Sequence, residues 1–291
     1  MTKSIFVVGK NRSGTKWLSN ILLNHEKITG VQGQFHAGIL ESNILNDISL
    51  SFGTLNDIDN YIGFTEWFSA TDYFEITGIK KSFLYKKHYL CYYDLFNELM
   101  NEFCRKENIE SWLQKINSLK LPEIYTFFKS SKFIIIEREL IGNIGSAWFL
   151  QLQNSGKSSL FRETYLYALT KKIHKKLRKN NNVFFLKYSD LMEQPEEILK
   201  KLCRFLDVSY STDLQVVKFE RNTSYKKGEK KLGTKKIILI KIYYFLLMNI
   251  PYFVLRWVYS LITMIKRTQR NNRFYTIPGT FSGSYKKLKK K

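Results

Sequence analysis

The residues with the clearest chemical potential lie near the N-terminus, in the loop Gly9–Gly14 and the two positions that follow it. Arg12 carries a fixed positive charge, Ser13 and Thr15 carry hydroxyl donors, and Lys16 adds a second cation. Guanidinium, hydroxyl and backbone N–H groups in one short loop are the donors that bind phosphate or sulfate oxygens. The composition of this loop therefore indicates an anion-binding site.

The segments on either side of the loop predict the elements that would position it. Ile5–Val8 is an apolar run of strand length, and Trp17, Leu18, Ile21 and Leu22 recur at helical spacing. A strand, a glycine loop and a helix in this order direct the loop N–H groups and the positive end of the helix dipole at one anion. An ordinary strand-to-helix turn is the alternative interpretation.

The loop differs from the nucleotide-binding P-loop by one transposition. Gly9 and Gly14 have the spacing of G-x-x-x-x-G-K-[ST], but Thr15 and Lys16 stand in the reverse order. In the P-loop, the Lys bridges the β- and γ-phosphates and the following hydroxyl holds Mg²⁺. With the order reversed, Arg12 is the cation inside the loop. The pattern favours a metal-free terminal phosphate group and argues against a P-loop kinase or NTPase, which remains an alternative.

Two later segments also place polar residues directly after a buried strand. Phe133–Ile136 is a short β-branched run, followed by Arg138 and, eight residues further on, Ser146. Val183–Leu186 is a second such run, followed by Tyr188. A charged residue that caps a buried parallel strand often lies at a ligand-binding edge. We therefore expect these side chains to belong to the same site.

Structural interpretations stay open for these residues. Arg138 could form an ion pair with Glu137 or Glu139, and Tyr188 could be a packed core tyrosine. Beyond Tyr188, Pro195 predicts the first turn of a helix. The buried stripe of that helix is predicted to contain Ile198, Leu199, Leu202, Phe205 and Leu206.

Taken in order, the three segments resemble the cofactor-binding segments of sulfotransferases that use 3′-phosphoadenylyl sulfate (PAPS). The first segment matches as G-x-x-R-S-G-T-x-W-L, and the second as an Arg and a Ser at the family's spacing. The third segment matches in Tyr188, Asp190, Leu191 and Pro195. Leu140 stands where the family usually has Pro, and residues 43–120 show no match.

The resemblance implies a P-loop-like three-layer α/β fold with a central parallel sheet, and it implies roles for single residues. Arg138 and Ser146 are implied to hold the 3′-phosphate, and Tyr188 to contact the nucleotide. The 5′-phosphosulfate loop is implied to contribute Arg12, Ser13, Gly14, Thr15, Lys16 and Trp17. The family's late R-K-G motif is loosely resembled by Lys226, Lys227 and Gly228, which equally fit a solvated lysine cluster.

A hydroxyl acceptor requires a general base. Many relatives place a catalytic Glu in the segment after the first helix, where this chain has Gln34, which cannot act as a base. His36 is the preferred candidate, because an unperturbed imidazole titrates near neutral pH. Glu41 and His88 are the alternatives. Arg12 is expected to act in catalysis by stabilising the charge on the leaving nucleotide.

Length and composition favour one sizeable α/β domain with an appendage. Three cysteines, Cys91, Cys104 and Cys203, and four scattered histidines show no metal-ligand spacing, so we expect a reducing compartment and no metal. The net charge of +22 is concentrated at the C-terminal end, where residues 221–291 hold 18 Lys and Arg and one acid, Glu229. We therefore predict a catalytic domain over residues 1–220 and a separate module over 221–291.

The C-terminal module contains a long apolar segment, residues 237–265, flanked by lysine clusters. Lys241, Asn249 and Arg256 interrupt it, and Pro251 predicts a kink. An amphipathic helical segment with flanking cations suits a helix lying in the plane of an anionic membrane surface. A buried pair of core helices and a membrane-spanning segment are the alternatives. Nucleic-acid binding is disfavoured, because the cations flank an apolar stretch instead of alternating with stacking aromatics.

Together these observations predict a PAPS-dependent sulfotransferase. The expected acceptor is a hydroxyl or amine of a glycan or glycolipid, presented at the inner face of the membrane to a cytoplasmic, peripheral enzyme. A non-catalytic membrane-bound protein on a degenerate sulfotransferase scaffold is the second alternative.

Overall fold

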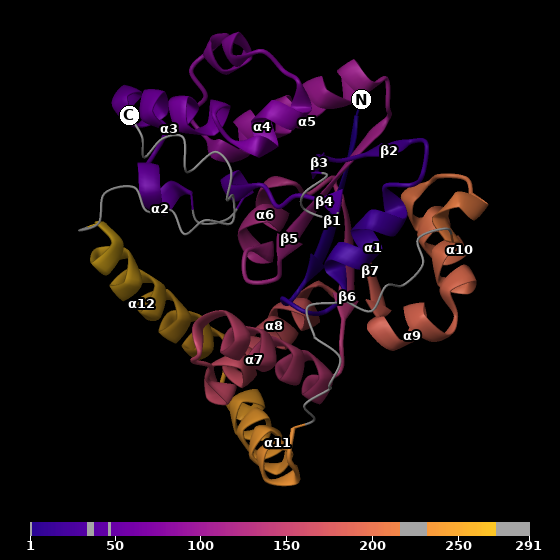
Figure 1. Ribbon diagram of the computed structural model, residues 1–291, viewed down its shortest axis with the longest axis vertical. Helices are drawn as coiled ribbons and strands as arrows, with labels where there is room; N and C mark the ends of the chain where they lie inside the picture. Colours follow the sequence, from indigo (N-terminus) through magenta and orange to yellow (C-terminus); the bar gives the residue numbers. More distant parts are fainter. Residues whose placement is uncertain (1, 34–37, 46–47, 216–231, 272–291) are drawn as a thin grey trace.

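The computed structural model describes residues 2–33, 38–45, 48–215 and 232–271 (Figure 1). Its centre is a five-stranded parallel sheet with the strand order β2-β5-β1-β6-β7. The strands are β2 (Ile28–Thr29), β5 (Ser111–Asn117), β1 (Lys3–Gly9), β6 (Lys132–Glu137) and β7 (Val183–Lys187). The three strands predicted from the sequence are thus present. All carboxyl ends of the parallel strands meet at one edge, next to the loop that follows β1.

Alternate side chains of β1 pack on opposite faces of the sheet, because successive strand residues point in opposite directions. Phe6 and Val8 belong to one core cluster, whereas Ile5 and Val7 belong to the other. All four side chains are at most 2% exposed. Burial on both faces is what the continuous apolar run predicts for a central parallel strand.

Helices cover both faces of the sheet and complete the predicted three-layer α/β fold, which is confirmed. On one face lie α1 (Thr15–Leu22), α9 (Tyr188–Glu193) and α10 (Pro195–Leu206). The other face packs against α5 (Tyr92–Glu107), α6 (Leu121–Phe127) and α8 (Leu160–Leu177). The long helix α7 (Leu140–Ser155) precedes α8 and packs against it. The stripe predicted for α10 is buried, except for Phe205, which is half-buried. The Phe205 ring packs on Phe184, and the Lys132 ammonium lies 4.8 Å from the ring centroid.

Residues 28–85, which the sequence left without a match over much of their length, form short elements. The pair β3 (Gln32–Gly33) and β4 (Gly38–Ile39) is antiparallel. Beyond them lie α2 (Ser49–Phe52), α3 (Ile58–Ser69), α4 (Asp72–Thr77) and the 3-10 helices Asn43–Leu45 and Lys81–Tyr85. Many of their aromatic side chains, among them Phe64, Phe68 and Tyr73, are buried in the core, whereas Tyr85 is 44% exposed.

The C-terminal apolar segment forms two helices, α11 (Thr234–Asn249) and α12 (Tyr252–Asn271), at the outer edge of α7 and α8 (Figure 1). The break falls at Pro251, as predicted, but the axes are bent by 109°, so a single kinked helix is wrong. Within the described residues, no single helix has the length and apolar character of a membrane span; α11 and α12 up to Met264 reach it only together. The predicted boundary at residue 220 lies outside the described residues.

Candidate active site

The loop between β1 and α1 has the tight backbone that the glycines predict. Gly14 has φ +93°, and a Cβ there would lie 2.7 Å from the ring of Tyr188. A Cβ on Gly9 would lie 2.6 Å from Cγ2 of Thr15, the buried first residue of α1. Arg12 has φ 73°, a left-handed conformation that is uncommon for a non-glycine residue. The strained backbone at Arg12 sits in the turn of the loop that the family resemblance assigns to the cofactor.

Buried Asn143 of α7 fixes the conformation of this loop. Its Nδ2 donates to the Asn11 carbonyl at 3.2 Å and to Oγ of Ser13 at 3.0 Å. The Ser13 hydroxyl is 2% exposed and accepts from an amide, so its own proton can be donated to a phosphate oxygen. Sequence reasoning missed Asn143. The signal was its position three residues before Ser146, on the same face of an otherwise apolar helix.

The three residues predicted to hold the two phosphate groups lie together. Nε of Arg12 donates to Oγ of Ser146 at 3.0 Å, and NH1 of Arg138 donates to the Arg12 carbonyl at 3.3 Å. Ser146 is buried in the second turn of α7. The structural alternative for Arg138 is also present, because its Nε lies 3.4 Å from a carboxylate oxygen of Glu139.

Tyr188 packs against the same group of residues. The guanidinium of Arg138 lies 4.8 Å from the centroid of its ring, and Trp17 packs on it edge-to-face at 5.9 Å. An arginine over an aromatic face is held by a cation–π interaction, which keeps the guanidinium plane oriented. The loop, Arg138 and Tyr188 therefore come together from three separate segments of the chain.

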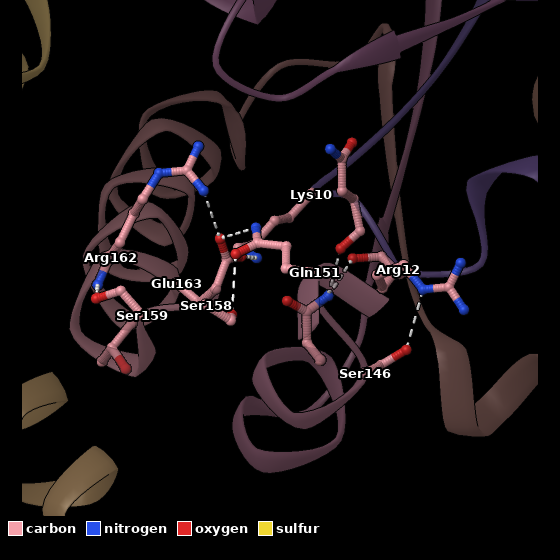
Figure 2. A network of polar contacts seen from close by, with 12 residues as sticks. Lys10, Arg12, Ser146, Gln151, Ser158, Ser159, Arg162 and Glu163 are labelled. Carbon is pink, nitrogen blue, oxygen red and sulfur yellow. Dashed lines mark hydrogen bonds and ion pairs between the residues drawn. The ribbon is translucent and has the colours of Figure 1, made fainter. Parts of the chain in front are cut away.

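Lys10 points away from Arg12 and Ser146 and forms a buried ion pair (Figure 2). Its Nζ lies 2.7 Å from Oε2 of Glu163 in α8, and both side chains are at most 6% exposed. Oε1 of Glu163 accepts from Gln151 at 2.7 Å and from Arg162 at 3.1 Å (Figure 2). Burial lowers the pKa of Lys10, although the Glu163 carboxylate acts in the opposite direction. The pair ties the first turn of the loop to α8.

Glu163→Gln is expected to destabilise the protein strongly. The substitution keeps the shape of the side chain but leaves the Lys10 ammonium buried without its counter-charge, which typically costs about 3–5 kcal/mol. The measurement is the free energy of unfolding in urea. Glu196→Gln is the matched control, since its ion pair with Lys200 is on the surface, and it should change stability little. Equal effects of the two substitutions would contradict the importance of the buried pair.

Glu41, Lys115 and Lys16 form a second charged group beside the loop. Lys115, near the end of β5, forms an ion pair with Glu41. The pKa of Lys16 is lowered by partial burial and by the charge of Lys115, while Glu41 raises it. This cluster holds a carboxylate in place beside two cations. Sequence reasoning named Glu41 and Lys16 but missed Lys115, which stands in a strand that it did not predict.

Of the remaining candidates, only His88 is among the described residues, and its recorded contacts are with other parts of the chain. His88 is exposed, its Nε2 contacts the Leu55 carbonyl, and its ring lies 4.6 Å from that of Tyr61. His36 and the group Lys226, Lys227 and Gly228 lie outside the described residues. Among the residues that the structure describes, no group of three or more His, Cys, Asp or Glu could hold a metal ion.

A largely buried polar network is centred on Glu137, the last residue of β6 and the neighbour of Arg138 in the chain. Glu137 accepts from Nδ1 of His174 at 2.8 Å and from Lys171 at 2.6 Å. Burial alone would raise the pKa of Glu137, but these hydrogen bonds outweigh it and lower the pKa to about 2. Because Nδ1 donates to a carboxylate, Nε2 of a neutral His174 accepts from the Ser118 hydroxyl at 2.9 Å. Burial lowers the pKa of His174.

This network predicts that stability falls as the pH is lowered below about 6.5. The unfolded chain binds a proton at His174 near pH 6.5, the ordinary value, whereas the folded protein resists it. The unfolded state then holds more protons, so acid favours it. Between pH 7.5 and 5.5 we therefore expect this group to contribute a loss of stability. Urea unfolding at both pH values should show a smaller loss for His174→Gln; an equal loss would contradict this origin.

Comparison with known proteins decides the family. A model of the sulfotransferase family matches residues 4–212, which is most of the chain. The chain belongs to the sulfotransferase family. Membership confirms the predicted enzyme class, a PAPS-dependent sulfotransferase, and decides against the P-loop kinase or NTPase. None of the curated proteins searched matches the chain in sequence.

Solved structures of other sulfotransferases share this fold at low sequence identity. The sulfotransferase domain of the curacin biosynthetic pathway has a TM-score of 0.52 and 18% identity, covering 81% of this chain and 82% of its own. That of the Synechococcus olefin synthase has 0.50 and 13%, covering 89% and 95%. A Mycobacterium tuberculosis sulfotransferase has 0.51 and 12%, covering 84% and 76%. These likenesses establish the fold of this sulfotransferase.

Proposed function

We propose that this sulfotransferase transfers the sulfuryl group of PAPS to a hydroxyl or amine of a glycan or glycolipid, without a metal. The proposal is carried by one observation. Arg12 comes from the N-terminal loop, and Arg138 and Ser146 come from a second segment. Arg12 is hydrogen-bonded to both of them, to Ser146 through its Nε and to Arg138 through its carbonyl oxygen. This geometry supports an anion site in which Arg138 and Ser146 bind the 3′-phosphate and the loop binds the 5′-phosphosulfate.

In the reaction, the bond between sulfur and the bridging oxygen of the nucleotide breaks, and a bond from sulfur to the acceptor oxygen or nitrogen forms. Negative charge develops on the bridging oxygen, where Arg12, the Ser13 hydroxyl and the loop N–H groups would stabilise it. A base takes the acceptor proton, so the products are the sulfated acceptor, 3′,5′-ADP and the protonated base. Glu41 or His36 would be that base. Of these two residues, the structure describes Glu41.

Location and acceptor are proposed from the C-terminal module. Its excess of cations supports contact with an anionic membrane surface, and we place the enzyme at the inner face of the membrane, in the cytoplasm. The three cysteines are free thiols, which suits a reducing compartment. A lipid-linked glycan or a glycolipid would be presented there, and nucleic acid is not a proposed partner.

Binding of 3′,5′-ADP in the presence of EDTA tests the cofactor site. Calorimetry is expected to show binding without metal, and 5′-AMP, which lacks the 3′-phosphate, is expected to bind at least about tenfold more weakly. Arg138→Met should remove most of this difference between the two nucleotides. Equal affinities of the wild-type protein for both nucleotides would overturn the assignment of the 3′-phosphate to Arg138 and Ser146.

A further inference from the structure

The helices α11 and α12 lie outside the residues matched by the family model, yet they pack tightly on the catalytic fold (Figure 1). Ile240, Leu247 and Leu255 are at most 4% exposed. Nζ of Lys172 in α8 donates to the Met248 carbonyl at 2.9 Å. Arg256 of α12 forms an ion pair of 2.8 Å with Glu123 in α6. We call the bent pair of helices, α11 and α12, the elbow. One side of the elbow is therefore an integral part of the fold.

The inner side of α11 reaches the residues assigned to the 3′-phosphate. Ile240 forms a buried cluster with Ile144 and Tyr167, and the ring of Tyr244 packs edge-to-face on Tyr167 at 5.7 Å. The Tyr167 hydroxyl donates to the Arg138 carbonyl at 2.8 Å. Because α11 holds Tyr167 in place, and Tyr167 holds the backbone of Arg138, the helix can position the phosphate site without touching the ligand.

The outer side of the elbow is apolar and exposed. Ile238, Ile242 and Phe245 follow each other at i, i+4 and i+7 on α11 and are 52%, 54% and 68% exposed. On α12, Phe253 and Trp257 are 71% and 63% exposed. Large apolar side chains gathered along exposed helix faces mark an interaction surface more often than an ordinary solvated one.

The charges around this surface identify its partner. Residues 232–264 contain no Asp or Glu, while Lys235 and Lys241 are exposed beside the apolar side chains. A second copy of the chain would bring an equally basic surface, so self-association is opposed by repulsion. An anionic bilayer offers both a hydrocarbon interior for the apolar side chains and negative headgroups for the lysines.

We propose that the elbow of α11 and α12 is a two-sided element. Its outer side docks on an anionic lipid bilayer, and its inner side positions Tyr167 and Arg138 of the cofactor site. The positioning role rests on the proposed cofactor site, whereas the docking role deepens the proposed membrane contact and does not depend on the cofactor site. Two adjacent residues, Tyr244 and Phe245, separate the two roles, because one is on the inner side and the other on the outer side.

The experiment compares two full-length variants in two assays. Binding of 3′,5′-ADP is measured by calorimetry, and binding to vesicles by co-sedimentation, with phosphatidylcholine alone or with phosphatidylglycerol added. Tyr244→Ala is expected to weaken 3′,5′-ADP binding roughly tenfold and to leave vesicle binding unchanged. Tyr244→Phe, which keeps the ring, should restore the wild-type affinity. Phe245→Ser with Ile242→Ser should weaken vesicle binding more than about tenfold and leave 3′,5′-ADP affinity unchanged.

Each part can fail separately. Wild-type affinity for 3′,5′-ADP in Tyr244→Ala would overturn the positioning role. Vesicle binding that survives the outer substitutions, or that does not require phosphatidylglycerol, would overturn docking on an anionic bilayer. A wild-type dimer in analytical ultracentrifugation that the outer substitutions abolish would make a second copy the occupant instead. A wild-type protein that binds vesicles but no 3′,5′-ADP would refute the proposed cofactor site and leave the docking role standing.

Discussion

Arg12→Ala is expected to lower kcat by at least about 10²–10³-fold, the effect of removing one preorganised donor to a developing oxyanion. The loop has two cations; Lys10 is paired with buried Glu163, whereas the Nε of Arg12 donates to Ser146 at 3.0 Å. The charge it opposes develops on the leaving nucleotide only in the transition state. We therefore expect a smaller change in affinity for 3′,5′-ADP than in kcat. Steady-state kinetics with PAPS, together with calorimetry, measures both effects.

Two further expected results make this prediction specific to the side chain of Arg12. Arg12→Lys keeps the charge and loses the planar fork, so it should recover part of the activity. Arg12 has φ 73°, a backbone strain that alanine would share, so neither variant should change stability greatly. A kcat within about threefold of the wild type in Arg12→Ala would show that Arg12 does not stabilise the leaving group.

The second large effect is expected from Glu41→Gln, which should lower kcat by about 10²–10⁴-fold if Glu41 is the general base. Its carboxylate is held by Lys115, beside the loop. The amide keeps the shape but cannot take the acceptor proton. Because Glu41 is not proposed to bind PAPS, affinity for 3′,5′-ADP should stay near the wild-type value. Initial rates with saturating PAPS measure the loss.

Glu66→Gln is the matched control, because Glu66 is also a carboxylate in an ion pair with a lysine, Lys81, but lies on the surface of α3. It should retain full activity. If Glu41→Gln also kept full activity, the assignment to Glu41 would be wrong. His36→Asn would then be the variant expected to lose activity.

The parts of the site that the sequence predicted are those encoded locally. Continuous apolar runs identified β1, β6 and β7, because both faces of these strands are buried. Arg138 and Tyr188 follow the ends of two such strands, so placing the strands placed the residues. The sequence singled out Gly14 as part of the loop, and the structure gives the reason for a glycine there: φ is +93°, and a Cβ would lie 2.7 Å from the Tyr188 ring.

What the sequence did not reveal depends on contacts between distant segments. Lys10 resembles any loop lysine, and its partner Glu163 lies 153 residues away. Glu137 was considered as a partner of Arg138, but it pairs with His174 and Lys171 instead. Burial of both partners decides these pairings, and no local pattern reports it.

The C-terminal helices show a different limit. In the sequence, Lys241 and Arg256 both interrupt one apolar segment, but the 109° bend places them on two separate helices. Arg256 turns toward the protein and pairs with Glu123, whereas Lys241 is exposed. Because apolar residues lie on both sides of α11, hydropathy alone could not distinguish the buried side from the exposed one.

The most direct test of the central claim is sulfate transfer from PAPS labelled in its sulfuryl group to glycans and lipids extracted from membranes, in the presence of EDTA. The account predicts labelled product with the wild-type protein, together with an equal amount of 3′,5′-ADP, and almost none with Arg12→Ala. Labelled product formed equally by the wild type and by Arg12→Ala would contradict the proposed cofactor site. Release of 3′,5′-ADP without any labelled glycan or glycolipid would contradict the proposed acceptor.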